Sequence, residues 1–403
     1  MSTQRRVPAI TGVGLVTGLG ASARETWSAV RQGRSAVQTL ELDGLRLLAA
    51  PASLHDAPTI EANVSLALHA AREAVTDAGI RPEELAGSRT ACTISSSKGG
   101  MKSLFRLHRE FLRGKAPPPE FWEHVSAASP GMAVAREFGI TGIVVNYAAA
   151  CATGVHSVIA GLKLITSGKA DVVLAGAADA SLVPAIVAAF DRMGVLSHRW
   201  DDAAGACRPF DRTRDGFAIG EGAAVLVLES PERAGHRADR VYARLTGSAW
   251  GTDAYDLARL STAQSEIAPL IQRALAEAGR SAADVDYINA HGTGTVANDP
   301  IEAAAIRRAL GEQTRRVPVS SLKPAVGHLL GAAGGTELAL TVLAMRDGFI
   351  PPTLNLNEPD PECTLNHVAN QGIERELNAA VKVAAGFGGH IGIVVIERGE
   401  RSG

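Results

Sequence analysis

Two stretches of this chain, 200 residues apart, resemble each other both in sequence and in the segments that come after them. The segment AREAVTDAGIRPEEL at 71–85 is similar to IQRALAEAGRSAADV at 271–285, with alanine and glycine at matching places. Each predicts a helix that ends at a glycine able to adopt the left-handed conformation, Gly79 or Gly279. A polar link and an apolar strand come after each helix. The repeat predicts two similar halves packed around a pseudo-twofold axis, and the alternative is a coincidence between alanine-rich helices.

The boundary between the halves is expected near residue 240, which gives an N-terminal half at 1–240 and a C-terminal half at 241–403. In both, short apolar runs alternate with alanine-rich amphipathic segments, the pattern of an α/β fold. The expected strands are 7–12, 90–96, 143–148, 171–175, 223–228, 286–290, 317–320, 380–386 and 391–397, and the expected helices are 22–31, 60–78, 151–167, 182–191, 264–278, 300–309 and 331–346. The last of these is apolar almost all round, so it is expected to be buried.

Composition limits the function. A net charge of −2 gives no electrostatic case for binding nucleic acid. No window approaches the roughly 20 apolar residues of a membrane span. The short, glycine-rich N-terminal apolar run favours a first strand over a signal peptide. The four cysteines show no C-x-x-C spacing, so neither a zinc ribbon nor a dithiol motif is indicated, and we expect a cytoplasmic protein.

One of these cysteines, Cys151, lies where an apolar run meets a Gly/Ala-rich segment, in NYAAACATGVHS. A strand at 143–148 followed by a helix from about 152 places the thiol at a helix N-terminus, where unpaired amides and the helix dipole lower a thiol pKa. The small neighbouring residues permit a tight turn and close approach of a substrate. Cys151 is therefore either a nucleophile at a strand-to-helix turn or a buried structural cysteine.

Three further segments carry candidate catalytic groups. His291 follows an expected strand in the loop NAHGTGT, and Lys323 and His328 flank a loop that enters the apolar helix. The segment GFGGH at 386–390 joins two apolar strands and carries Phe387. Each has an ordinary alternative: a hydrogen-bonded loop histidine, a solvated loop lysine or a common glycine turn. Together these groups have the content of nucleophilic acyl chemistry, in which imidazoles and backbone amides stabilise an oxyanion.

Nearly from end to end, the sequence resembles the β-ketoacyl-acyl carrier protein synthases of the thiolase superfamily, most of all the elongating synthases of fatty acid and type II polyketide systems. The motifs that carry the resemblance are ITGVGLVTGLG, NYAAACATGVHS, GKADVVLAGAADAS, RPFDRTRDGFAIGEGAAVLVLE, INAHGTGTVANDPIEAAAI, SSLKPAVGHLLGAAGG, DGFIPPTLNLNEPDPEC and AAGFGGHIGIVVIER. The resemblance implies a thiolase-like five-layered αβαβα fold with internal duplication.

The resemblance also implies roles for individual residues. Cys151 matches the acylated nucleophile. His291 and His328 match the two histidines that assist malonyl decarboxylation and stabilise the enolate and thioester oxygens. Lys323 matches the lysine that supports the second histidine, and Glu221 matches the acid in that lysine's network.

The remaining matches concern substrate binding. The backbone amides of Cys151 and Phe387 match an oxyanion hole, and Phe387 also matches a gating aromatic. Thr293 and Thr295 match threonines that hydrogen-bond the phosphopantetheine arm. The implied reaction is decarboxylative condensation of an acyl group with a malonyl unit. The implied partners are an acyl carrier protein with its malonyl and acyl thioesters, and a second subunit in a homodimer or a heterodimer. No metal or organic cofactor is implied beyond the carrier's own prosthetic arm.

The sequence departs from the family pattern at several places. The region 38–60 is compressed, Ile391 stands where an asparagine is usual, and Pro324 stands where a serine is usual. Two other functions therefore stay open, a non-elongating partner subunit and a thiolase or acyltransferase of the same fold. Thiolases use a second cysteine near the C-terminus, whereas the glycine loop here carries His390 and Cys363 lies in another loop.

Overall fold

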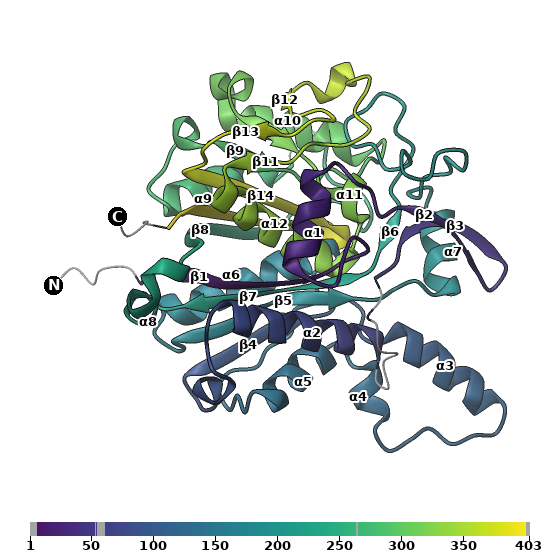
Figure 1. The fold of residues 1–403 in the computed structure, drawn as a ribbon. Coiled ribbons are helices and arrows are strands. Elements are labelled where there is room, and N and C mark those ends of the chain that lie inside the picture. The colour runs from purple at the N-terminus through teal and green to yellow at the C-terminus, as the bar shows by residue number, and fades with distance from the viewer. Residues whose placement is uncertain (1–5, 53, 55–60, 263–264, 400–403) are drawn as a thin grey trace.

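The computed structural model describes residues 6–399 except 53, 55–60, 263 and 264 (Figure 1). Ten strands form one sheet, in the order β12-β10-β9-β14-β15-β8-β1-β7-β5-β4. Their bounds are β1 (Ala9–Val16), β4 (Thr90–Ser95), β5 (Val172–Asp179), β7 (Gly222–Glu229), β8 (Ala243–Thr252), β9 (Tyr287–Asn289), β10 (Pro318–Ser320), β12 (Asn366–His367), β14 (Ala379–Gly386) and β15 (His390–Arg398). A three-stranded sheet contains β2 (Gln38–Leu42), β3 (Leu45–Ala50) and β6 (Ile219–Gly220), and β11 (Phe349–Ile350) pairs with β13 (Ile373–Glu374).

The strand order repeats itself outward from the centre of the large sheet. On one side of the central β1–β8 pair lie β7, β5 and β4, and on the other side lie β15, β14 and β9. In each half the two inner pairings are antiparallel and the third is parallel. Within the sheet, β1 and β8 join the two halves through the described pairs Ala9↔Arg244 and Ile10↔Ala243. This symmetry is the internal duplication that the sequence predicts.

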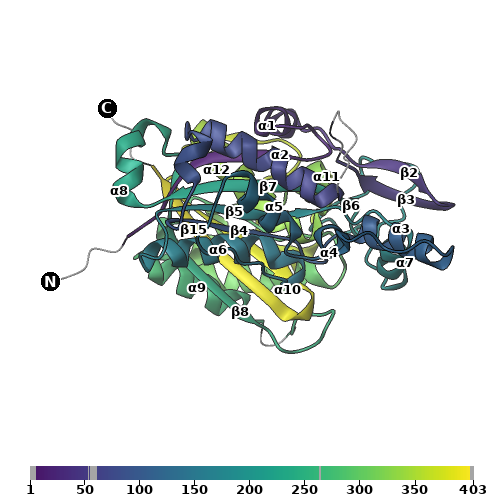
Figure 2. The same cartoon turned by 90° about the horizontal axis from the view of Figure 1, so that it is seen from below.

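Helices cover and separate the two halves of the sheet (Figures 1 and 2). They are α1 (Ala23–Arg31), α2 (Ala62–Asp77), α3 (Met101–Leu112), α4 (Phe121–Val125), α5 (Ser129–Glu137), α6 (Thr153–Thr166), α7 (Pro184–Arg192), α8 (Pro231–Ala234), α9 (Ile267–Glu277), α10 (Asn298–Leu310), α11 (Lys323–Val326) and α12 (Ala333–Asp347). α2 and α5 pack on the outside of the N-terminal half, and α9 with α10 on the outside of the other. α6 and α12 contact strands of both halves, which makes five layers.

The repeated segments have equivalent packing. A Cβ on Gly12 of β1 would lie 2.1 Å from the Ala74 carbonyl oxygen of α2, and a Cβ on Gly247 of β8 would lie 2.1 Å from the Ala274 carbonyl oxygen of α9. Each helix therefore approaches its strand at a distance that only glycine permits. The glycines that end the two helices have φ of +64° and +68°. These pairs explain why alanine and glycine recur 200 residues apart, while the boundary near 240 stays a prediction.

The predicted strand at 143–148 is wrong. Only Val144 forms a parallel bridge, with Cys92 of β4. Beyond it, a side chain replaces the ladder, because Asn146 Oδ1 accepts the Ser96 N–H at 3.1 Å. β4 and β9 are equivalent strands in the two halves of the sheet. The bridge at Val144 lies next to β4 in the position that β10 has next to β9.

The other predicted elements are found, with shifted bounds. The predicted helix at 151–167 begins as a 3-10 turn and becomes α6 at Thr153. The first residues of the predicted helices at 60–78 and 264–278 lie outside the described residues. Seven helices and strands described in the N-terminal half were not predicted: β2, β3, β6, α3, α4, α5 and α8. β2 and β3 form a hairpin within the compressed region 38–60, whose last residues are also outside the described part.

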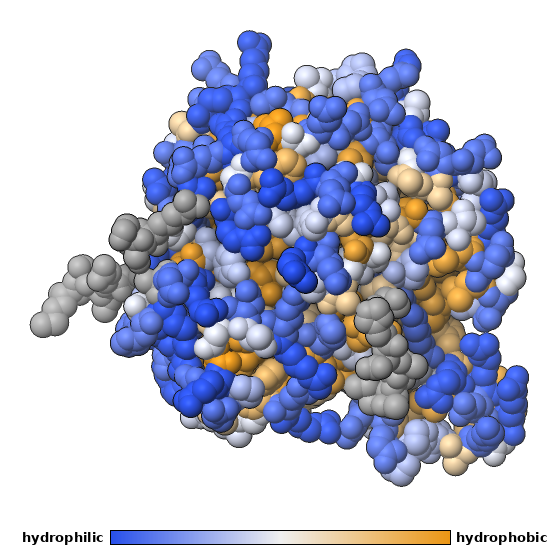
Figure 3. All heavy atoms as spheres, viewed as in Figure 1, coloured by the Kyte–Doolittle hydropathy of each residue, from blue (hydrophilic) through white to orange (hydrophobic). Residues whose placement is uncertain are grey.

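The predicted burial of the apolar helix is confirmed, because α12 is buried from Ala333 to Met345. Gly154 of α6 permits the close contact with it, since a Cβ there would lie 2.5 Å from the Gly335 nitrogen. The face in Figure 3 is largely hydrophilic with scattered apolar patches. Within the described residues, every helix is too short or too polar to cross a membrane.

Candidate active site

Cys151 lies in the 3-10 turn (Ala150–Ala152) that leads directly into α6, and it is 7% exposed. The preceding residue, Ala150, has φ of +45°, a left-handed conformation that is costly for a residue with a Cβ. Thr153 Oγ1 donates to the Ala150 carbonyl at 2.8 Å and so braces the turn. The equivalent turn of the C-terminal half, at Leu330 with φ of +49°, leads into α12. The strained turn places Cys151 just before the start of α6, among the residues that line a cavity.

The predicted lowering of the thiol pKa is wrong in this structure. Burial raises the pKa of Cys151 to about 11, although the positive charges of Lys98 and Lys323 lower it. The thiolate loses its hydration in this interior position, and that loss outweighs the two cations. The thiol is therefore protonated at neutral pH, and its proton must leave as a sulfur–carbon bond forms.

His291 follows β9 and His328 follows α11, and the two rings lie 5.6 Å apart at 80°. Burial lowers the pKa of both imidazoles well below the usual range, and the charge of Lys323 lowers both further. His328 Nδ1 accepts the Leu330 N–H at 3.3 Å. Lys323 Nζ lies 3.4 Å from His291 Nδ1, and an ammonium can only donate. Both rings are therefore neutral, and the network assigns the proton of each to Nε2.

Lys323 is fully buried and contacts His291, because its ammonium donates to the His291 carbonyl oxygen and lies beside Nδ1. The prediction that it supports the second histidine, His328, is wrong in this respect. The backbone of His328 is held elsewhere, since its N–H donates to Ala218 and its carbonyl accepts from Gly220, each at 2.8 Å. These bonds tie His328 to the strand β6 and leave the lysine with the first histidine.

The predicted acid in this network is also wrong. Glu221 Oε1 lies 2.7 Å from Lys102 Nζ of α3 and accepts the Leu182 N–H at 3.0 Å. The carboxylate that pairs with Lys323 is Glu337 of α12, whose Oε1 lies 2.6 Å from the ammonium. Glu337 is the one acidic residue in the apolar segment 331–346, and that isolation was the sequence signal that could have found it.

A second polar cluster, also not predicted, lies beside the Cys151 turn. Asp179, at the end of β5 and 1% exposed, lies 3.1 Å from Lys98 Nζ and accepts the Ser97 hydroxyl at 2.6 Å. It also accepts the Gly331 N–H at 3.2 Å. A cation and a carboxylate are thus held next to the turn that carries the thiol.

The loop after β14 brings backbone amides toward the cysteine. A Cβ on Gly386 would lie 2.9 Å from the Cys151 nitrogen and 3.1 Å from the Ala152 nitrogen. Phe387 follows Gly386, is partly buried, and stacks on Phe190 with centroids 6.2 Å apart. The segment that carries Phe387 therefore lies next to the turn that carries Cys151.

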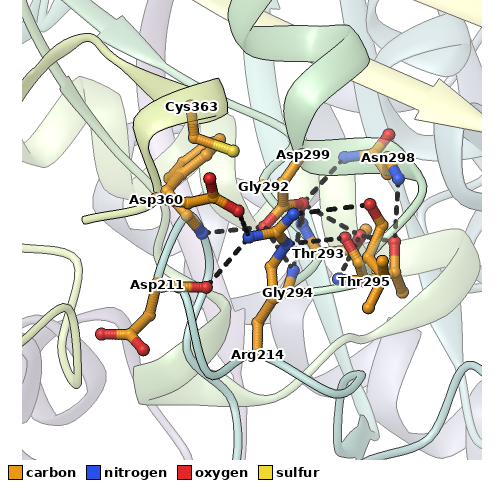
Figure 4. Close-up of polar contacts among 12 residues, drawn as sticks. Asp211, Arg214, Gly292, Thr293, Gly294, Thr295, Asn298, Asp299, Asp360 and Cys363 are labelled. Atoms are coloured by element: carbon orange, nitrogen blue, oxygen red, sulfur yellow. Dashed lines mark hydrogen bonds and ion pairs between the residues drawn. The ribbon is translucent and has the colours of Figure 1, made fainter. Parts of the chain in front are cut away.

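The threonine loop follows β9 (Figure 4). The hydroxyl oxygens of Thr293 and Thr295 lie 2.9 Å apart. Asp299 of α10 accepts the N–H groups of Thr293 and Gly294 at 3.2 Å each. Arg214 Nε donates to the Thr295 carbonyl at 3.2 Å. These bonds fix the loop, and its two threonine hydroxyl groups hydrogen-bond to each other.

One cavity of about 560 Å³ joins these groups. Its lining includes Cys151, His291, Thr293, Thr295, His328, Gly386 and Phe387. At its edge, Tyr255 and Val296 are 64% and 67% exposed, and both also line it. Within the described residues, no group of three or more His, Cys, Asp and Glu side chains is arranged to hold a metal ion. A thiol, two neutral imidazoles, two hydroxyls and backbone amides suit an acyl thioester on an amide-bearing arm.

Comparison with known proteins agrees with this geometry. The family described as beta-ketoacyl synthase matches twice, with its N-terminal domain at residues 48–234 and its C-terminal domain at 242–357. The tetracenomycin polyketide synthase ketoacyl synthase alpha subunit of Streptomyces glaucescens is 37% identical over 96% of this chain and 96% of its own length. The 3-oxoacyl-[acyl-carrier-protein] synthase 2 of Coxiella burnetii is 34% identical over 98% of this chain and 99% of its own.

Solved structures give the same assignment. A type II polyketide synthase acyl-carrier protein in complex with its ketosynthase bound to the hexaketide, AntDE:AntF, contains a chain that superimposes with a TM-score of 0.92. It is 32% identical, and the match covers 98% of this chain and 100% of that one. The chain therefore belongs to the β-ketoacyl synthase family, condensing acyltransferases of the thiolase fold.

Proposed function

We propose that an acyl group held as a thioester on Cys151 condenses with a malonyl unit on an acyl carrier protein, in fatty acid or polyketide biosynthesis. The observation that carries the proposal is that Cys151, His291, His328 and Phe387 line one cavity. The names of the relatives, ketoacyl synthases of a polyketide system and a carrier-protein-dependent synthase, support carrier-bound substrates. No cofactor takes part in the proposed reaction beyond the carrier's phosphopantetheine arm, which Thr293 and Thr295 bind.

In the first step, Cys151 Sγ attacks the thioester carbonyl of an acyl-carrier. The new sulfur–carbon bond forms, the carrier's sulfur–carbon bond breaks, and the thiol proton ends on the departing carrier thiol. Because the Cys151 pKa is about 11, the thiol is protonated before the attack, and its proton leaves as the sulfur–carbon bond forms. The amides of Cys151 and Phe387 stabilise the oxyanion, and each such donor typically contributes about 3–4 kcal/mol.

In the second step, the malonyl-carrier loses carbon dioxide and its electron pair passes to the thioester oxygen as an enolate. The Nε2–H groups of His291 and His328 donate hydrogen bonds to that oxygen. The enolate carbon then attacks the acyl group on Cys151, and the released thiolate takes up a proton. Lys323 and Glu337 hold His291 in the tautomer that donates from Nε2.

A thiolase reaction is less well supported. Cys363 lies beside Arg214 and Asp360 (Figure 4), and it is not among the residues that line the cavity around Cys151. A purely structural subunit is also less well supported, because Cys151 and both histidines line the cavity together. We propose that the chain pairs with itself or with a second ketosynthase-like subunit, and native mass spectrometry distinguishes these assemblies.

Acidic carrier proteins favour a basic docking rim. Arg259 is exposed and lines the cavity, and Arg192 is exposed at the end of α7 beside Met193, which also lines it. We propose that these arginines contact the carrier. Reversing both charges with glutamate is expected to raise KM for the malonyl-carrier, with kcat nearly unchanged at saturation.

The test is a condensation assay with malonyl-carrier and acyl-carrier, read by the mass of the carrier-bound product. The wild-type protein is expected to give the β-ketoacyl-carrier, and Cys151→Ala none. Cys151→Gln is expected to release carbon dioxide from malonyl-carrier without condensation, because both histidines remain. Condensation by Cys151→Ala at the wild-type rate refutes the proposed role of this cysteine.

A further inference from the structure

Lys382 is a buried lysine that the proposed reaction does not use. It lies in β14, the strand that leads into the Gly386 loop, and its side chain is fully buried. Its ammonium donates to Asn289 Oδ1 and to the Ala290 carbonyl at 2.9 Å each, and lies 2.5 Å from Glu337 Oε2. Three oxygens from two other elements therefore surround this cation directly behind the His291 loop.

Glu337 connects Lys382 to the catalytic imidazole. Its Oε2 contacts Lys382, its Oε1 lies 2.6 Å from Lys323, and Lys323 lies 3.4 Å from His291 Nδ1. One carboxylate thus fixes two ammonium groups on opposite sides. Because all three ions are buried, a displacement of Glu337 leaves both ammonium groups without a carboxylate partner, which makes the arrangement stiff.

A second carboxylate balances the second ammonium. Glu302 of α10 accepts the His291 N–H at 2.6 Å and the Gly292 N–H at 2.7 Å. The charge of Glu302 stabilises the ammonium of Lys382, and the reverse also holds. Burial lowers the Lys382 pKa to about 8, with Glu337 opposing that shift, so the lysine is mostly charged at neutral pH.

The groups that face His291 come from every element around it. They are Lys323 of α11, Glu337 of α12, Lys382 of β14, Glu302 and Asp299 of α10, His328 after α11, and Cys151 across the cavity. Burial is the first cause that lowers the pKa of both imidazoles. For both histidines, Lys323 and Lys382 act in the same direction as burial, and Lys98 adds to this for His328.

We propose that Lys382 is a positioning residue for the condensation: through Glu337 it holds Lys323 against His291, and its positive charge opposes protonation of the two catalytic imidazoles. This inference rests on the proposed function, since the reaction needs neutral imidazoles that donate from Nε2. It differs from a structural role for Lys382, because removing the charge changes how the histidines respond to pH.

The experiment measures carbon dioxide release from malonyl-carrier as a function of pH. Lys382→Gln keeps an N–H donor for the Ala290 carbonyl and removes the charge, and Lys382→Met removes both. Either variant is expected to move the midpoint of the acidic limb upward by roughly 0.5–1 pH unit, because a nearby cation no longer opposes imidazole protonation. Lys382→Arg keeps the charge and is expected to retain the wild-type midpoint.

The control is Lys163→Met, which removes a lysine from an exposed pair with Glu277 and is expected to leave the midpoint unchanged. A purely structural role lowers the rate at every pH and lowers the melting temperature without moving the midpoint. That result in Lys382→Gln, or in Lys382→Met should the glutamine variant not fold, overturns the inference. Wild-type protein that releases no carbon dioxide instead refutes the proposed function.

Discussion

Replacing Glu337 with glutamine removes the shared negative charge and keeps the shape of the side chain. Lys323 and Lys382 are both fully buried and each lies within 2.6 Å of a Glu337 oxygen. Removing one partner of a buried ion pair typically costs about 3–5 kcal/mol, and here two cations lose the same partner. We therefore expect Glu337→Gln to lower the free energy of unfolding by about 5 kcal/mol. Proteins are typically stable by only about 5–15 kcal/mol, so this loss is a large part of the total.

Urea unfolding followed by circular dichroism measures this loss. The matched control is Glu374→Gln, which removes a carboxylate that is 70% exposed and pairs with Arg31 at 3.2 Å. An exposed pair of this kind contributes at most about 1 kcal/mol, so the control is expected to unfold almost as the wild type does. If Glu337→Gln also lost less than about 1 kcal/mol of unfolding free energy, the two lysines would not need this carboxylate to be stable in the interior.

Three further results are expected. Alkylation of Cys151 by iodoacetamide is expected to rise steadily with pH up to about 11, because burial raises the thiol pKa; a plateau by pH 9 contradicts this. Gly386→Ala is expected to slow acylation of Cys151 by about 10²–10³-fold, since its Cβ would lie 2.9 Å from the Cys151 nitrogen; stopped-flow acylation at the wild-type rate contradicts it. Decarboxylation is expected to hold from pH 7 to below 6.5 and to fall only as the pH passes the lowered pKa values of His291 and His328; half-loss at or above 6.5 contradicts it.

The α/β class, the duplication and the turn that carries Cys151 into a helix were within reach of the sequence because each depends on local pattern. Periodicity predicts strands and helices, and the 200-residue repeat reflects a close approach of helix to strand that needs glycine at Gly12 and Gly247. The strand predicted at 143–148 failed because a side chain, that of Asn146, takes over its pairing. Hydrophobic periodicity predicts strands that pair through their backbones. It does not detect a side chain that hydrogen-bonds in place of the backbone.

The buried network of charged side chains around His291 could not be predicted from sequence patterns. Lys323, Glu337 and Lys382 come from α11, α12 and β14, and only the tertiary packing decides which carboxylate each ammonium meets. For that reason Glu221 was assigned to Lys323, whereas the fold pairs it with Lys102. The predicted lowering of the Cys151 pKa was wrong for a similar reason. The sequence shows that a helix begins at the cysteine, but it does not show how deeply the thiol is buried.

The most direct test is intact-protein and peptide mass spectrometry after incubation with an acyl-carrier. The account predicts one acyl adduct per chain, on the peptide that contains Cys151, and no adduct in Cys151→Ala. The other cysteines, Cys92, Cys207 and Cys363, are also buried and serve as internal controls that are expected to stay unmodified. An adduct that persists in Cys151→Ala, or that maps to another cysteine, contradicts the central claim.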